Sequence, residues 1–314
     1  MSRRDSRLKT EYAEPSRKRS GLIADIAALI KLRQTTLLVV SMYASFILGG
    51  GIGYPLKMHM LVVALGYIAI SSVTAINMYF DRDIDAIMPR TMERPLASGR
   101  LNPNMVLAVS ISLLVASLAL ASIYINIYYS IAIAIGFMFD IVAYTILLKR
   151  KTPLSIVAGA VAGGAPSLGG WAAATGTIDV NALLLSLLVV VWVPAHIWFL
   201  ATFYREDYRR ASVPMLPVVA DPNVTAMGIG FGALIMGYVI VGLWLNRVIG
   251  AVSLAYGLFA STHLFAMAVN YGLTGGDEIY ARRAFKITNM HLGILYMVMV
   301  LEKAIAPGLS LGLD

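Results

Sequence analysis

The chain has 314 residues, of which 59% are hydrophobic and only 13% are charged. Soluble globular proteins carry about 25% charged residues, so this composition excludes a soluble domain and indicates a polytopic membrane protein. There is no cysteine, which excludes disulfides, thiolate metal sites and cysteine nucleophiles. The formal net charge is +8.

Residues 1–20 are polar and basic, and no short apolar segment with a small-residue cleavage site follows them. This excludes a cleavable signal peptide and predicts a disordered cytoplasmic tail beside an anionic membrane surface. Residues 22–34 have the pattern of an amphipathic helix that lies on that surface. We treat 21–314 as a single transmembrane domain.

A membrane-spanning helix needs about 20 mostly apolar residues, and by this rule the sequence predicts nine spans. The fold class is therefore all-α, with nine transmembrane helices bundled around a central cavity. The predicted spans are 35–54, 60–80, 103–123, 128–148, 154–175, 180–203, 224–246, 249–272 and 286–306.

The basic residues orient these spans. All but three of the 25 Lys and Arg residues fall on the side of the N-terminus, and the exceptions are Lys57, Arg247 and Lys303. Positive residues collect in cytoplasmic loops, so this side is predicted to be cytoplasmic and the C-terminus to be outside. Most of the acids share the cytoplasmic side, which predicts a cavity open to the cytoplasm in the cell membrane.

The densest charge follows the second span, in the stretch NMYFDRDIDAIMPRTMERPLASGR that begins at Asn77. Asn77, Asp81 and Asp85 recur every four residues and so share one helix face. Oxygen ligands of this kind suit Mg²⁺. The arginines Arg82, Arg90 and Arg94 suit a diphosphate. The alternative is that these groups only form interfacial ion pairs at the end of the span.

Two further stretches belong to the cytoplasmic side. Lys149 and Arg150 end the fourth span, where the positive-inside rule alone also accounts for them. The stretch FYREDYRRASVPMLPVV follows the sixth span and contains Asp207 and Tyr208. Its acids and arginines are predicted to face the first cluster across one cavity, with Mg²⁺ ions bridging a diphosphate between them.

Few ionisable groups lie inside the predicted spans. Asp140 is the one acid clearly within a span, and His196 and His263 accompany it. His196 lies one to two turns before the second charged cluster, so it is the histidine best placed to have a functional role there. A lone histidine on an apolar helix is also typical of a hydrogen-bonded structural residue.

The first cluster resembles the N-x-x-x-D-x-x-x-D motif of the UbiA superfamily of intramembrane prenyltransferases. The stretches YTILLKRKTPLSIVAGAVAGGAPSLGGWAAATG and PAHIWFLATFYREDYRRASVPMLPVV resemble the branch of that superfamily that farnesylates protohaem IX. The similarity covers most of the chain beyond residue 25. The sequence departs from the wider superfamily after Asp207. Four residues further on it has Ala211, where the wider superfamily often has a second aspartate.

The resemblance implies a Mg²⁺-dependent enzyme that transfers farnesyl from farnesyl diphosphate to a vinyl group of haem b, giving haem O. It implies Asn77, Asp81, Asp85 and Asp207 as catalytic metal ligands and Tyr208 beside the allylic cation. It implies His196 as the haem-binding residue. The diphosphate would be bound by cationic side chains, namely Arg82, Arg90, Arg94, Lys149 and Arg150.

Two alternatives remain at this stage. A UbiA-type enzyme could use another acceptor, such as an aromatic acid, a quinone precursor or a glycerol-phosphate lipid. A transporter is the alternative from another class, but it places its ionisable groups near the membrane midplane. The expected partners are the two substrates, membrane lipid and proteins of downstream haem modification or terminal oxidase assembly, and no nucleic acid.

Overall fold

The computed structural model describes residues 21–305. The predicted tail 1–20 and the last residues, 306–314, lie outside the described part of the chain. Within 21–305 every regular element is a helix, as the composition predicts, and no strand occurs. Short helices flank the long ones: they are α2 (Leu22–Leu29), η1 (Gly51–Gly53), α9 (Arg205–Arg210) and α10 (Leu216–Val219).

Eight of the helical segments in 21–305 are long and apolar enough to cross a membrane. The segment predicted as the first span, α3 (Leu32–Leu48), is a shorter apolar helix of 17 residues. The ninth span therefore stays a prediction. The eight segments are α4 (Leu56–Ile87), α5 (Pro103–Tyr124), α6 (Ile127–Phe137) continued by η2 (Met138–Leu148), α7 (Ser155–Thr175), α8 (Val180–Phe203), α11 (Pro222–Leu245), α12 (Ala251–Leu273) and α13 (Glu278–Ile305).

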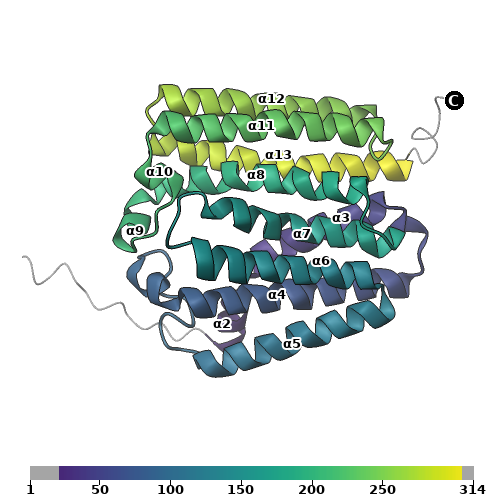
Figure 1. The fold of residues 1–314 in the computed structure, drawn as a ribbon, viewed down its shortest axis with the longest axis horizontal. Helices are drawn as coiled ribbons and strands as arrows, with labels where there is room; N and C mark the ends of the chain where they lie inside the picture. Colours follow the sequence, from purple (N-terminus) through teal and green to yellow (C-terminus); the bar gives the residue numbers. More distant parts are fainter. Residues whose placement is uncertain (1–20, 306–314) are drawn as a thin grey trace, which may run out of the picture.

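The long helices run side by side, and α9, α10 and the segment after α4 gather at one end of the bundle (Figure 1). Small residues let α7 approach its neighbours closely. A Cβ atom at Gly170 would lie 1.8 Å from the carbonyl oxygen of Met42 on α3, and one at Gly164 would lie 2.7 Å from that of Ser186 on α8. The glycine-rich helix α7 is thereby held between α3 and α8.

The predicted surface helix 22–34 is interrupted in the structure. Helix α2 ends at Leu29, and Lys31 adopts a left-handed backbone with φ of 46° before α3 begins. This conformation is uncommon for a residue with a side chain. Helix α2 is held on the bundle by Asp25, whose carboxylate accepts a hydrogen bond of 2.9 Å from Arg100 in the segment after α4. The break lets the Lys31 side chain turn into the bundle.

Two of the long helices differ from the predicted spans at the ends that bear the polar residues. Helix α4 continues without a break to Ile87, seven residues beyond the predicted end of the second span, so it includes the whole acidic face. The fourth span changes to a π-helix over Met138–Leu148, and the N–H of Lys149 closes it by donating to the carbonyl of Tyr144. Wide helical turns of this kind are rare in proteins. Those that do occur are often found at functional sites.

The π-helix decides which side chains share a face. At about 100° per residue, an α-helix would place Asp140 and Lys149 on opposite sides. At about 4.4 residues per turn, the π-helix brings Lys149 back to within about 20° of Asp140, with Tyr144 close to the same line. All three residues consequently line one cavity.

Candidate active site

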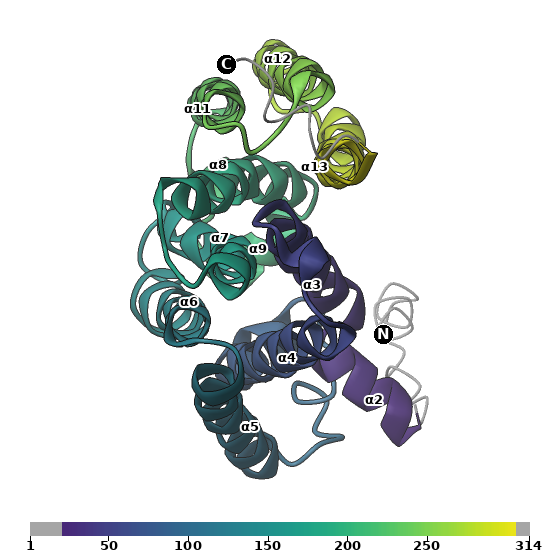
Figure 2. The same cartoon turned by 90° about the vertical axis from the view of Figure 1, so that its right-hand side faces the viewer.

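One cavity of about 610 Å³ lies inside the bundle. It is bounded by α3, α4, α6, η2, α7, α8 and α13. Figure 2 shows α3, α4, α6, α7 and α8 around the middle of the bundle. Its wall is largely apolar, with residues such as Ile70, Ile133 and Leu200. Charged side chains concentrate at the end of the cavity that lies near α9 and the segment after α4. The cavity thus combines a polar end with a hydrocarbon-lined interior.

The acidic face of α4 forms part of this polar end. Asn77, Asp81 and Asp85 are all buried, and all three line the cavity. The prediction that they share one face is therefore confirmed. Asp83 lies on the outer side of α4, where 58% of its side chain is exposed and Arg150 binds it through two hydrogen bonds of 2.6 and 2.7 Å.

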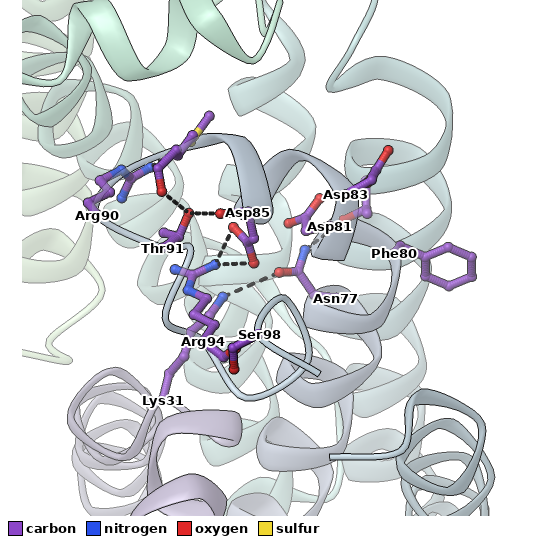
Figure 3. A network of polar contacts seen from close by, with 12 residues as sticks. Lys31, Asn77, Phe80, Asp81, Asp83, Asp85, Arg90, Thr91, Arg94 and Ser98 are labelled. Atoms are coloured by element: carbon purple, nitrogen blue, oxygen red, sulfur yellow. Dashed lines mark hydrogen bonds and ion pairs between the residues drawn. The ribbon is translucent and has the colours of Figure 1, made fainter. Parts of the chain in front are cut away.

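Each residue of the acidic face contacts one cation (Figure 3 shows those of Asn77 and Asp85). Lys31 Nζ donates to Asn77 Oδ1 over 3.3 Å. Lys149 Nζ lies 2.5 Å from Asp81 Oδ2. Arg94 Nη1 lies 2.8 Å from both carboxylate oxygens of Asp85.

Burial and neighbouring charges affect these cations differently. Burial lowers the pKa of Lys31 to about 8, and the positive charge of Arg94 acts in the same direction. Burial alone would also lower the pKa of Lys149, but the neighbouring Tyr144 and Asp81 outweigh it and the net direction is upward. Lys149 consequently stays protonated at neutral pH.

The residues present fit a magnesium ion that has further oxygen ligands. Within 21–305 no three His, Cys, Asp or Glu side chains lie close enough to hold a metal ion by themselves. Asp81 Oδ1, however, is buried without a hydrogen-bond partner in the part of the chain that the structure describes. Asn77 is oriented by its amide nitrogen, which donates to Thr145 Oγ1 over 2.8 Å. A free carboxylate oxygen and an oriented amide oxygen leave most of the Mg²⁺ shell to water and phosphate, as this ion prefers.

The second charged cluster meets the first through Arg90. The Arg90 guanidinium lies 5.0 Å from the ring centres of both Tyr204 and Tyr208 and donates to the Tyr208 hydroxyl over 2.9 Å. Arg90 and Tyr208 line the cavity. Asp207 does not line it, and its carboxylate lies 3.9 Å from Arg90. Arg90 therefore connects the two charged clusters, and the role of Asp207 as a metal ligand stays a prediction.

Two of the predicted diphosphate ligands lie away from the cavity. Arg82 donates to the carbonyl of Tyr79 and stacks over that residue's ring at 4.3 Å. Arg150 is engaged by Asp83 on the outer side of α4, and this hydrogen bond raises its pKa. Neither arginine lines the cavity, whereas Arg90, Arg94 and Lys149 do. No sequence pattern separates the arginines that line the cavity from those that do not.

His196 lines the cavity on α8. Its imidazole is stacked between Trp192 and Phe285, with ring centres 4.6 Å away on each side. Its Nδ1 is buried without a hydrogen-bond partner in the described part of the chain. An imidazole held in one orientation with a free ring nitrogen is suited to bind a metal or a donor group.

Three residues of the polar end are not predicted from the sequence: Lys31, Tyr144 and Thr145. Lys31 is separated from Asn77 by 46 positions and lies where an unbroken surface helix was predicted. Tyr144 and Thr145 depend on the π-helix for their orientation. A lysine immediately before an apolar helix is the only sequence signal that pointed to any of them.

Comparison with known proteins identifies a family and relatives for this chain. The model of the UbiA prenyltransferase family matches residues 37–290. A protoheme IX farnesyltransferase from Hyperthermus butylicus is 60% identical over 93% of this chain and 98% of its own length. Another protoheme IX farnesyltransferase, from Aeropyrum pernix, is 38% identical over 93% of this chain and 96% of its own length.

Solved structures share the fold at low sequence identity. A digeranylgeranylglyceryl phosphate synthase superposes with a TM-score of 0.74 at 18% identity, covering 89% of this chain and 98% of its own. A UbiA homologue from Archaeoglobus fulgidus bound to GPP and Mg²⁺ superposes with a TM-score of 0.59 at 16% identity, covering 88% of this chain and 99% of its own.

Proposed function

The chain belongs to the UbiA prenyltransferase family, and from this premise we propose that it transfers a farnesyl group from farnesyl diphosphate to a vinyl group of haem b. The observation that carries the proposal is the cavity, in which buried oxygen ligands and cations occupy one end of a hydrocarbon-lined space. An amphiphilic substrate with an anionic head and an apolar tail matches this division. The names of the two curated relatives support haem b as the acceptor.

The acidic face of α4 is our proposed Mg²⁺ site, with Asn77, Asp81 and Asp85 as ligands. A bound Mg²⁺ would neutralise charge on the diphosphate and make it a better leaving group. The A. fulgidus homologue, described with GPP and Mg²⁺, supports a metal-dependent reaction. Asp207 would contribute through Arg90, which its carboxylate approaches to 3.9 Å, or through a second ion on its own side of the cavity.

The cations of the polar end are our proposed diphosphate ligands. Arg90, Arg94 and Lys149 line the cavity, and each already contacts a hydroxyl or a carboxylate that holds it in place. Lys31 would add a fourth positive charge on the side of α3. Fixed donors that face the charge formed when the C–O bond breaks lower the barrier without further reorganisation. Tyr208 would lie over the allylic cation.

The acceptor would be held by His196. We propose that its free ring nitrogen is the axial ligand of the haem iron, and that the stacking of Trp192 and Phe285 fixes the ring. A vinyl group then attacks C1 of the farnesyl cation, and water captures the positive charge left on the other vinyl carbon to give haem O. The role of the protein is mainly to orient both substrates.

The cellular setting is proposed on the distribution of charge. The basic residues put the polar end of the cavity, and the N-terminus, on the cytoplasmic side of the cell membrane, with the C-terminus outside. Haem O would then pass to proteins of haem modification or terminal oxidase assembly.

The direct test is to incubate purified protein in lipid with haem b, farnesyl diphosphate and Mg²⁺ and to search for the mass of haem O. Product that depends on all three components is the expected result. Folded protein that forms no haem O but prenylates an aromatic acid, a quinone precursor or a glycerol-phosphate lipid would reject haem b and favour the other acceptor class. Solute transport without diphosphate release would favour a transporter.

A further inference from the structure

Asp140 is a carboxylate in a membrane span that the proposed function does not use. It lies in the π-helix η2 and lines the cavity. Its carboxylate forms no hydrogen bond or ion pair with any residue of 21–305, although the charges of Lys31, Lys149 and Asp81 act on it. An ionisable group inside a membrane span is costly, and it indicates a functional site by default.

The other acids of the site differ from Asp140 in this respect. Asp81 is paired with Lys149, Asp83 with Arg150 and Asp85 with Arg94. Glu302, also in a span, accepts hydrogen bonds from the backbone N–H groups of α12. Asp140 alone among these presents an uncommitted carboxylate to the interior of the cavity.

The depth of Asp140 relative to the metal ligands follows from a chain of contacts. Asn77, the innermost ligand on α4, donates to Thr145, and the Thr145 hydroxyl donates to the backbone carbonyl of Asp140 over 2.6 Å. Along the same face of η2, Lys149 marks the polar end and Asp140 lies farthest from it. A carboxylate in this place adjoins the inner limit of the diphosphate site, where C1 of a bound prenyl chain would begin.

We propose that Asp140 binds the water that is added to the vinyl group and accepts its proton. This inference rests on the proposed function. The C1–O bond breaks with its electron pair on the diphosphate, and the vinyl π electrons form the new C–C bond. The resulting cation is captured by the water oxygen, one O–H bond breaks, and its proton passes to the Asp140 carboxylate. Overall, one water is consumed and no electrons leave the substrates.

The test compares wild-type protein with Asp140→Asn and Asp140→Glu. Asparagine keeps the shape of the side chain but accepts no proton, so haem O formation should fall about a hundredfold, in the range of general base catalysis. The KM for farnesyl diphosphate and the Mg²⁺ requirement should stay within about twofold. A product lighter than haem O by one water should appear, because the cation then loses a proton instead of being hydrated. Glutamate should restore part of the rate.

Stability separates this role from a structural one. Asp140→Asn removes an unpaired charge, so its thermal midpoint should be equal to or above that of the wild type. Glu302→Gln is the matched control, since it converts a hydrogen-bonded carboxylate of a span to an amide. It should lower the thermal midpoint and leave kcat unchanged.

Several outcomes would overturn the inference. Wild-type rate and product with Asp140→Asn would exclude a role in hydration. A raised Mg²⁺ requirement would make Asp140 a metal ligand, and a lowered thermal midpoint with unchanged kcat would make it structural. If the wild-type protein itself makes no haem O, the proposed function fails, and the inference fails with it.

Discussion

Lys149 contacts one oxygen of the Asp81 carboxylate and leaves the other, Oδ1, buried without a hydrogen-bond partner among residues 21–305. Asp81 lines the cavity together with Asn77 and Asp85. The pair therefore combines a fixed cation with an available anionic ligand. A site that must hold both a metal ion and a diphosphate needs this combination.

Asp81→Asn should lower kcat/KM for farnesyl diphosphate by about a hundredfold or more, because both the ligand charge and the pairing with Lys149 are lost. The apparent Mg²⁺ affinity, measured by titration of activity, should fall as well. Asp83→Asn is the matched control two positions away. Its side chain is largely exposed and points away from the cavity, so both quantities should stay near wild type. Equal losses in the two variants would contradict the assignment of the acidic face.

The arginines give a second contrast. Arg94→Gln should raise the KM for farnesyl diphosphate about tenfold or more, because it removes a cation that lines the cavity and is fixed by Asp85. Arg82→Gln should change it little, since Arg82 is held on Tyr79 outside the cavity. Steady-state kinetics of diphosphate release would measure both. A larger effect of Arg82→Gln would mean that the diphosphate binds beside Arg82 and not beside Arg94.

Haem ligation can be measured without turnover. His196→Gln should change the Soret band of bound haem b and weaken haem binding about tenfold or more, while the affinity for farnesyl diphosphate stays unchanged. His263→Gln is a suitable control, because His263 is engaged with His291 and does not line the cavity. An unaltered Soret band in His196→Gln would show that the iron has another ligand.

The packing of α7 predicts a difference in stability. In Gly170→Ala the new methyl group meets the backbone of α3, so the fold should lose about 3 kcal/mol or fail to assemble. Gly293→Ala, on α13, has no atom within 4 Å of the new Cβ and should gain up to about 1 kcal/mol from helix propensity. Thermal denaturation in detergent would measure both. Similar thermal midpoints in the two variants would mean that α3 moves to accommodate the new methyl group without loss of stability.

Much of the fold was predictable because apolar length is a strong signal in a membrane protein. The lengths of α5, α7 and α8 lie within a few residues of the predicted spans. The acidic face was also predictable, since its spacing needs only one continuous α-helix. The end of α4 was predicted too early, because the charges of the acidic face do not resemble a span although the helix continues through them.

The remainder of the site depends on interactions that sequence periodicity does not contain. Lys31 enters the site because the backbone adopts a left-handed conformation between α2 and α3. Whether an arginine points into the cavity or away from it depends on which aspartate it pairs with, for example Asp85 or Asp83. In the sequence, these aspartates belong to one charged stretch and cannot be told apart by position. The resemblance implies Asp207 as a metal ligand, and no sequence pattern indicates that its carboxylate lies 3.9 Å from Arg90.

The π-helix also has a consequence for how the chain tolerates changes in length. Deleting one residue within Met138–Leu148 favours an ordinary α-helix, because each π turn contains about one residue more than an α turn. The shortened segment would still be apolar enough to insert. A deletion between Asp140 and Lys149 would, however, leave these two residues about 80° apart on the α-helix instead of about 20°. Asp140 would then be displaced relative to Lys149, so the deletion should reduce enzymatic activity without preventing membrane insertion.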